Sequence, residues 1–198
     1  ATNQSGTLTF YDGSGAKLKS QKLTLKSGAR ADISAHQFGS LIGFAEWIPS
    51  SMSSRFQMRN VHYFYDNALA NPSFDAAFQV EAIKGTGEQV VVPYDLAPFS
   101  STRDPLERGR LLLSNTTNGT VKLTVNIYGA NGSLSSGSPL SLNLPAHATT
   151  SEIGAVLAGT GIITIDSNTS SSVIVTFTKV RLTSTYHIQN LYSLLAAQ

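Results

Sequence analysis

The chain repeats part of its own sequence. Residues 7–31 align without gaps on residues 124–148, an offset of 117 positions. The identical pairs are Thr7/Thr124, Tyr11/Tyr128, Gly15/Gly132, Leu23/Leu140, Leu25/Leu142, Ala29/Ala146 and Ala31/Ala148. After one inserted residue the match resumes with Gly43/Gly161, Ser53/Ser171 and Ser54/Ser172. A repeat of this length is a whole small domain and is too long for a solenoid unit, so it predicts two related modules in tandem.

Alternation of apolar and polar residues with a period of two predominates along the chain and predicts β-strands. Turn sequences separate the expected strands, among them Asp12-Gly13-Ser14-Gly15 and Asn118-Gly119. Asn-Gly and Asp-Gly supply the positive φ that tight hairpins need. The pattern therefore predicts an all-β fold made of two tandem antiparallel β-sandwich modules, Ig-like or jelly-roll-like.

The expected modules span 1–98 and 106–198, and the proline-containing segment 97–105 is the expected linker. In the second copy a strand at 110–113 precedes the turn at 115–119, whereas the first copy begins at that turn. Module 1 is therefore expected to lack its first strand. A missing strand leaves an open edge that invites pairing with a neighbouring molecule or an upstream segment. The alternative is that module 1 has no such strand and needs none.

Composition narrows the classes of function. Charged residues make up 13% of the chain, about half the usual quarter, and Ser and Thr together number 45. Such a surface suits a secreted protein or a subunit that packs against others. The net charge is +2 without a Lys/Arg cluster, which argues against nucleic-acid binding. The sequence contains no cysteine and no apolar segment long enough to span a membrane.

No catalytic or metal-binding motif is evident in the sequence. The histidines His36, His62, His147 and His187 lack metal-ligand spacing, so we interpret them as surface or turn residues. Ser14 to Lys17 fits Ser-x-x-Lys but falls in a hairpin turn and not at a helix start. The Asp-containing turns lack the carboxylate density of a calcium loop. We therefore expect no catalytic residue, cofactor or metal, and an enzyme is the third hypothesis.

Two segments are candidates for an assembly interface. The acceptor edge is expected near Leu8 and Phe10, next to the missing strand. The donor is expected in the apolar C-terminal stretch, at Ile188, Leu191, Tyr192, Leu194 and Leu195. This stretch is either a last core strand that closes module 2 or a segment that docks onto a neighbouring subunit.

Aromatic residues allow a second kind of site. The strand that contains Tyr63 and Tyr65 places aromatic rings on both of its faces, and only one face can be core. With Tyr94, these rings could stack on a glycan; the alternative is a core plus a contact between modules. Trp47 aligns with the apolar Ile165 and is read as core. Five Asn-x-Ser/Thr triplets are potential glycosylation acceptors in a secreted protein, headed by Asn3, Asn115, Asn118, Asn131 and Asn168.

Four stretches resemble the tandem β-sandwich modules of secreted bacterial cell-surface multidomain proteins. They are Gly6-Thr7-Leu8-Thr9-Phe10-Tyr11-Asp12, Gly43-Phe44-Ala45-Glu46-Trp47, Val92-Pro93-Tyr94-Asp95 and Leu113-Ser114-Asn115-Thr116. These are turn and core signatures, so the resemblance implies a fold and a role in surface display or adhesion, with no assigned activity.

Together these features predict a non-enzymatic extracellular structural protein of the cell surface. We expect it to self-assemble through strand pairing, as a filament or surface-layer-like subunit, or to pair with another cell-surface protein. The alternative is a surface adhesin or a carbohydrate-binding module.

Overall fold

The computed structural model describes residues 3–34, 43–51, 57–66, 73–81, 89–96, 106–150, 159–182 and 188–196. In this part of the chain every regular element is a β-strand and every strand pair is antiparallel. The all-β, antiparallel fold expected from the period-two pattern is thus confirmed. Among the described residues no helix is long and apolar enough to cross a membrane.

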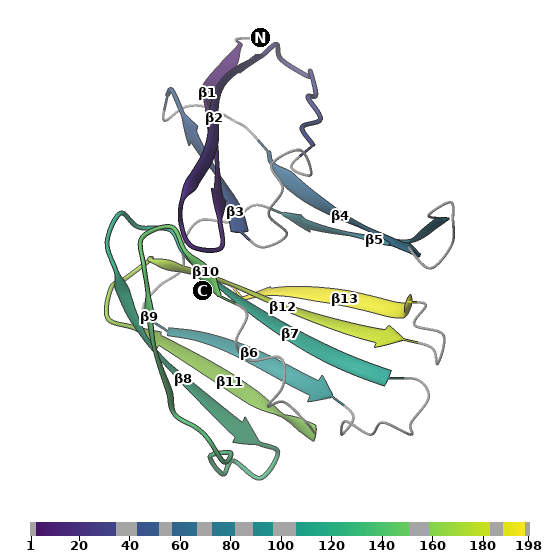
Figure 1. The fold of residues 1–198 in the computed structure, drawn as a ribbon, viewed down its shortest axis with the longest axis vertical. Coiled ribbons are helices and arrows are strands. Elements are labelled where there is room, and N and C mark those ends of the chain that lie inside the picture. Colours follow the sequence, from purple (N-terminus) through teal and green to yellow (C-terminus); the bar gives the residue numbers. More distant parts are fainter. Residues whose placement is uncertain are drawn as a thin grey trace.

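Two four-stranded sheets face each other in the C-terminal part of the chain (Figure 1). One sheet has the order β6-β11-β8-β9 and consists of β6 (Gln89–Leu96), β11 (Gly159–Ser167), β8 (Val121–Gly129) and β9 (Leu140–Leu144). The other has the order β10-β7-β12-β13 and consists of β10 (Thr149–Thr150), β7 (Leu106–Asn115), β12 (Val173–Leu182) and β13 (Ile188–Ala196). We call this pair of sheets the sandwich.

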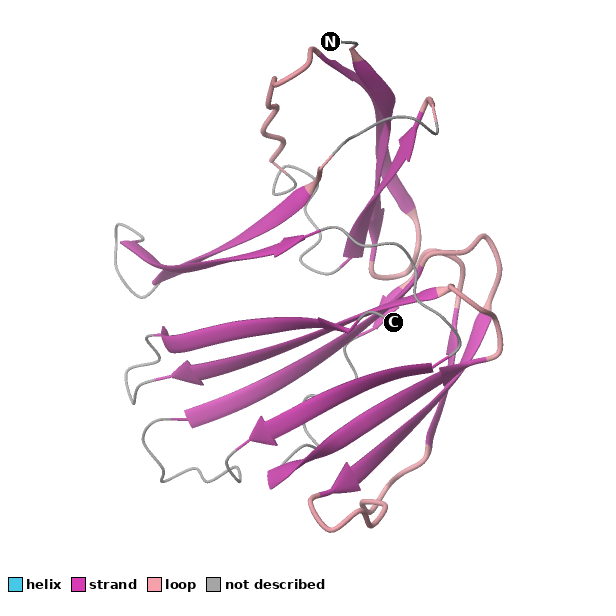
Figure 2. Cartoon of the chain, turned by 180° about the vertical axis from the view of Figure 1, so that it is seen from behind, coloured by secondary structure: helices cyan, strands magenta, loops and turns pink. Residues whose placement is uncertain are grey.

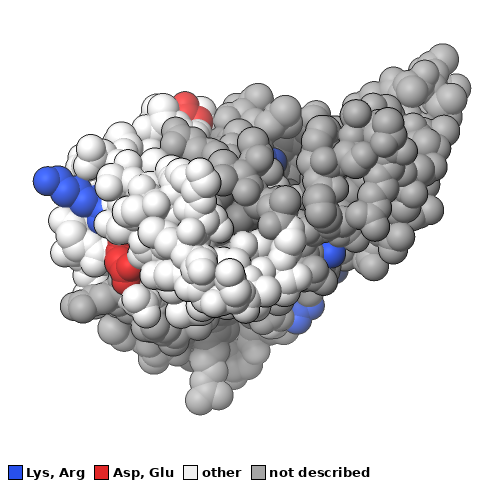
Figure 3. Space-filling model, turned by 90° about the horizontal axis from the view of Figure 1, so that it is seen from below, with Lys and Arg blue, Asp and Glu red and all other residues white. Residues whose placement is uncertain are grey.

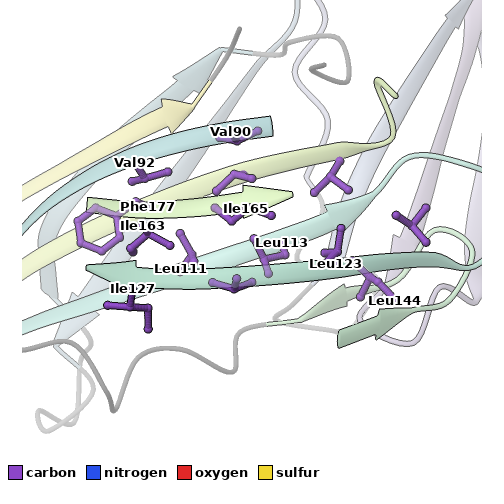
Figure 4. Packing of buried hydrophobic residues seen from close by; sticks show 14 of the residues in the cluster. Val90, Val92, Leu111, Leu113, Leu123, Ile127, Leu144, Ile163, Ile165 and Phe177 are labelled. Carbon is purple, nitrogen blue, oxygen red and sulfur yellow. The ribbon is translucent and has the colours of Figure 1, made fainter. Parts of the chain in front are cut away.

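The core of the sandwich lies between these sheets (Figure 4). In β8 every second residue from Val121 to Ile127 is buried, because successive side chains of a strand point to opposite faces. Leu111 and Leu113 of β7 and Phe177 of β12 meet them from the opposite sheet, each no more than 1% exposed. Burial of such side chains contributes roughly 1.5–3 kcal/mol each and holds the two sheets together.

The N-terminal part contains two smaller sheets. The first has the order β2-β1-β3 and consists of β1 (Gln4–Asp12), β2 (Lys17–Leu25) and β3 (Gly43–Pro49). The second is the hairpin of β4 (Arg59–Asp66) and β5 (Ser73–Glu81). Figures 1 and 2 show this hairpin beside the sandwich, where β5 lies next to β13.

One strand has a different partner from the one that its position in the sequence suggested. Residues 89–96 fall at the end of the range expected for module 1. Instead, β6 pairs with β11 along its whole length, from Gln89 opposite Asp166 to Leu96 opposite Gly159. Val90, Val92 and Tyr94 belong to the core of the sandwich. The expected linker, 97–105, lies outside the described residues.

Candidate functional site

The acceptor edge does not lie at Leu8 and Phe10. These two residues stand on β1, the central strand of its sheet, which pairs with β2 on one side and β3 on the other. Both side chains are also buried, at 5% and 8% exposure. The expectation of an open edge at β1 is therefore wrong, because both of its edges are occupied.

The outer strands of this sheet differ in chemistry. β2 carries exposed lysines at positions 17, 19 and 22, and lysine on an edge strand opposes pairing with another sheet. β3 carries no lysine and ends in Ile48, which is 55% exposed, and Pro49. Among the described strands β3 pairs only with β1. The outer edge of β3 is therefore the edge of this sheet that carries no lysine to oppose pairing with another strand.

The strand pairing of β1 with β3 matches that of β8 with β11. Asp12 lies opposite Gly43, and Gly129 lies opposite Gly161. The first residue of each pair is shifted by 117 positions and the second by 118, as in the sequence alignment. The hairpins β4–β5 and β12–β13 each contain one register shift. In β4–β5 the shift lies between Phe64 and Tyr65, and in β12–β13 it lies 117 positions later, between Arg181 and Leu182.

The turns that follow β1 and β8 share their backbone hydrogen bonds. Asp12 N–H donates to Ala16 O and Gly15 N–H to Asp12 O, each at 3.0 Å. In the second turn, Gly129 N–H donates to the oxygen of residue 133 and the N–H of residue 132 donates to Gly129 O, each at 2.9 Å. The offset is again 117, so the two hairpins begin in the same way.

The ungapped alignment fails in the next strand. β2 places Leu23 opposite Gly6, whereas β9 places Leu142, and not Leu140, at the corresponding position opposite Leu123. The offset there is 119, because the loop before β9 is two residues longer. The turns after β2 and β9 follow this new offset, since Gly28 and His147 both have positive φ, of 74° and 56°. His147 therefore holds a backbone conformation that favours glycine.

Gly43 and Gly161 mark the same close approach of two backbones. A Cβ on Gly161 would lie 1.9 Å from Tyr128 O, and one on Gly43 would lie 2.1 Å from Tyr11 O. Neither site can hold a larger residue without a shift of the strands. The surroundings differ, because Tyr94 of β6 covers Gly161 and donates its hydroxyl to Tyr128 O at 3.1 Å. Gly43 is exposed.

The turn 12–16 also joins the N-terminal sheet to the sandwich. Thr149 N–H donates to Gly13 O at 3.0 Å, across the two parts of the chain. Gly15 approaches so closely that a Cβ would lie 2.1 Å from Ala146 O. The carboxylate of Asp12 shapes the turn, since its Oδ1 accepts hydrogen bonds from Ser14 N, Ser14 Oγ and Ala16 N. These bonds hold the pKa of Asp12 below its usual value, with the Ser14 hydroxyl as the largest contributor.

Aromatic rings stack at the same junction. The imidazole of His147 lies parallel to the Tyr11 ring, with centroids 4.2 Å apart, and within 6.1 Å of Phe44. His147 Nε2 lies 2.9 Å from Asn118 Oδ1, and its buried Nδ1 has no hydrogen-bond partner among the described residues. The Tyr11 hydroxyl donates to Glu46 at 3.4 Å. Burial raises the pKa of Tyr11, and the Glu46 carboxylate raises it further.

Asn115 organises the turn of the sandwich that faces this junction. It is fully buried, and its Nδ2 donates to Gly119 O, Leu144 O and Pro145 O at 2.7–2.9 Å. Its Oδ1 accepts from Thr117 N and Oγ1. Since both atoms of the amide are used inside the fold, Asn115 is not accessible as a glycosylation acceptor in the folded chain.

The other candidate residues lie as follows. Ile188, Leu191, Tyr192, Leu194 and Leu195 stand on β13, which pairs with β12 inside the chain. Tyr94 is 4% exposed, so it cannot present a ring to a glycan. Tyr63 and Tyr65 stand on β4, paired with β5, and their side chains lie outside the described residues. In the described part of the chain no three His, Cys, Asp or Glu side chains are grouped to hold a metal.

Comparison with known proteins gives one structural likeness. No family model matches the chain, and no curated protein matches it. The chain is similar to a crystal structure of Thermotoga maritima 1070, with a TM-score of 0.43 and 12% sequence identity, over 56% of this chain and 93% of that one.

Proposed function

We propose that this chain is a non-enzymatic structural protein of a cell surface that assembles through strand pairing at the outer edge of β3. One observation carries the proposal. Among the described strands the β2-β1-β3 sheet ends at β3, whereas β11, which pairs with β8 as β3 pairs with β1, has a further strand on its outer side. By this proposal the N-terminal sheets are a copy of the sandwich that a partner strand completes.

The chemistry of the edges supports β3 as the assembly site. The outer strand of a sheet is where another strand can be added, and lysine or proline on that strand opposes the addition. The lysines of β2 oppose pairing of another strand with that edge. β6, an outer strand of the sandwich sheet, contains Pro93, which lacks an N–H to donate. β3 has neither a lysine nor a proline along Gly43–Ile48.

The proposal of an extracellular location rests on the residue composition of the protein. The chain is rich in hydroxyl side chains and poor in charge, and low charge reduces the repulsion that keeps proteins apart. On the face drawn in Figure 3, the described Lys, Arg, Asp and Glu side chains are scattered and form no single patch. A surface of this kind suits packing against neighbouring subunits better than recognition of a charged ligand.

The alternative proposal is a surface adhesin or carbohydrate-binding module. It depended on three tyrosines, and the burial of Tyr94 removes one of them from any glycan surface. A glycan array with the full chain tests what remains of this proposal. Binding that is lost on substitution of Tyr63 or Tyr65 by Ala supports it, and an array without hits at high protein concentration rejects it.

Light scattering across a dilution series, with electron microscopy of the same samples, tests self-association. The informative variant is Ile48→Lys, which places a lysine on the exposed end of β3. Leu18→Lys is the matched control, because Leu18 is 40% exposed on β2, an outer strand that already carries lysines. We expect the mass to rise with concentration for the parent and Leu18→Lys but not for Ile48→Lys. A strict 21.0 kDa monomer at every concentration contradicts self-association.

A further inference from the structure

We propose that copies of this chain bind end to end, with the turn 26–29 of one copy docked on the turn 129–133 of the next. This inference rests on the association of copies in the proposed function, and it adds a contact that does not use β3. The evidence is the junction between the N-terminal sheet and the sandwich, because each of its two turns has a second copy in the chain that is exposed to solvent.

At the junction, the turn 12–16 receives the turn that follows β9. Thr149 N–H donates to Gly13 O at 3.0 Å. Gly15 comes so close that a Cβ on it would lie 2.1 Å from Ala146 O. The two backbones therefore meet without a side chain between them, and a glycine is required in the receiving turn.

The turn 129–133, after β8, is a second copy of the receiving turn. It has the same two backbone hydrogen bonds as the turn 12–16, at an offset of 117 positions. The glycine is present as well, since Gly132 stands at the position of Gly15 and also has a positive φ. Residues 130–133 are exposed, and a Cβ on Gly132 would meet no described atom within 4 Å. The surface that receives a turn at the junction is therefore repeated here and is open to solvent.

The turn after β2 is a second copy of the turn after β9. In the first, Ala29 N–H donates to Lys26 O at 3.0 Å. In the second, Ala148 N–H donates to Pro145 O at 3.1 Å, 119 positions later. Residues 26–29 are all exposed. The chain therefore presents both halves of the junction contact a second time.

The two exposed turns lie at opposite ends of the molecule. Figure 1 shows the turn after β2 at the top, next to the N-terminus, and the turn after β8 at the bottom. A contact between them joins different surfaces of two copies, so it is heterologous. Such a contact leaves one turn of each kind unused at the two ends of the pair, and further copies extend it into an open filament.

The junction also indicates which atoms meet in the new contact. Shifting the close approach at the junction by the two offsets places Ser27 O of one copy against Gly132 of the next. The aromatic stack is not repeated, because Gly28 stands where the junction has a histidine. We therefore expect the contact between copies to be weaker than the junction and transient, as small interfaces are.

Cross-linking between copies tests the proposal, because the chain has no cysteine of its own and a covalent trap records a transient contact. Two single-cysteine proteins, Ser27→Cys and Ala130→Cys, are mixed and treated with a short bismaleimide. In the control mixture Asn143→Cys replaces Ala130→Cys, since Asn143 is exposed on β9 and lies outside both turns.

We expect the mixture of Ser27→Cys and Ala130→Cys to form a cross-linked dimer about tenfold faster than the control mixture or either protein alone. The reason is that reaction within a complex is effectively intramolecular. An excess of the parent chain, which offers both turns, should slow the reaction. Equal rates in the two mixtures, or no effect of excess parent, overturn the proposal.

Ile48→Lys separates this inference from assembly at β3. Introduced into both cysteine proteins, it should leave the rate of cross-linking unchanged, because position 48 lies outside both turns. Loss of the cross-link in this background contradicts the inference. If Ile48→Lys abolishes the rise in mass and the two cysteine mixtures react equally, assembly at β3 stands and the end-to-end contact is wrong. If the cross-link forms while the mass is the same with and without Ile48→Lys, the end-to-end contact stands and assembly at β3 is wrong.

Discussion

His147 stacks on Tyr11 with the ring planes 8° apart, and this pair joins the sandwich to the N-terminal sheet. His147 has a φ of 56°, in the turn where the corresponding residue after β2 is Gly28. A side chain in this backbone conformation is unfavourable, so the stack offsets a local cost. Together with the hydrogen bond from Thr149 N to Gly13 O, it makes the junction a specific contact.

Replacing His147 should weaken this junction. His147→Ala removes the stack and the contact with Asn118, and we expect a loss of about 1–2 kcal/mol in the free energy of unfolding by urea. Asn118→Ala removes only the second contact and should cost about 1 kcal/mol or less. If the two variants lose the same stability, the aromatic stack contributes nothing.

Gly15 and Gly132 occupy the same position in their two turns. Substituting each by Ala distinguishes the cost of losing the contact at the junction from the cost of backbone strain. Gly15 and Gly132 have φ of 89° and 77°, but a Cβ would meet Ala146 O only at Gly15, whereas it finds nothing within 4 Å at Gly132. Gly132→Ala should cost about 1 kcal/mol for its φ alone. Gly15→Ala should cost roughly 1–3 kcal/mol more, because the junction must open. Thermal unfolding of both variants measures the difference, and equal costs would mean that the turn does not dock there in solution.

The amide of Asn115 should be among the most sensitive polar groups of the sandwich. Asn115→Ala removes the amide that donates to Leu144 O and Pro145 O, and we expect a loss of about 2–4 kcal/mol. Asn131→Ala, at an exposed turn where the side chain accepts one bond from Ser133 N, should change stability by no more than about 0.5 kcal/mol. Chemical denaturation of the two variants checks this contrast. A similar small effect for both would contradict the buried network.

Tyr11 should make the junction sensitive to alkaline pH. Burial, followed by the charge and hydrogen bond of Glu46, raises the pKa of Tyr11 above 10.0, so the fold favours the protonated phenol. Its contribution to stability is complete below pH 10 and is lost as pH rises through the raised pKa. Between pH 9 and pH 11 the parent should therefore lose more stability than Tyr11→Phe, and Glu46→Gln should reduce the loss. Parallel profiles for the parent and Tyr11→Phe would show that the phenol does not contribute.

The strands could be predicted from the sequence because alternation and turn residues are local signals. The identity Gly43/Gly161 marks a position where the close approach of two backbones excludes a side chain, and the strand registers reproduce its offset. The sequence alignment is wrong in β2, where it pairs Leu23 with Leu140 although the strand registers pair it with Leu142. Leucine is tolerated at every second position of a strand, so Leu23 could be aligned with Leu140 as well as with Leu142.

The partner of each strand could not be predicted from the sequence. β6 follows β5 in the chain but pairs with β11, which lies about seventy residues later, because pairing depends on which edge remains available once the hairpins have formed. For the same reason the alternation at Leu8 and Phe10 could not reveal that β1 is paired on both sides. The junction was also missed, since no local pattern marks a His–Tyr stack between distant turns.

The account depends most on strand pairing at the outer edge of β3 during assembly, and amide hydrogen exchange at low and high protein concentration measures this directly. In the dilute chain, amides of β1 that bond to its two neighbours should exchange slowly. At concentrations where the mass has risen, amides of β3 should exchange more slowly than in the dilute chain, while those of β2 should be unchanged. No change in the exchange of β3 amides at those concentrations would contradict the account.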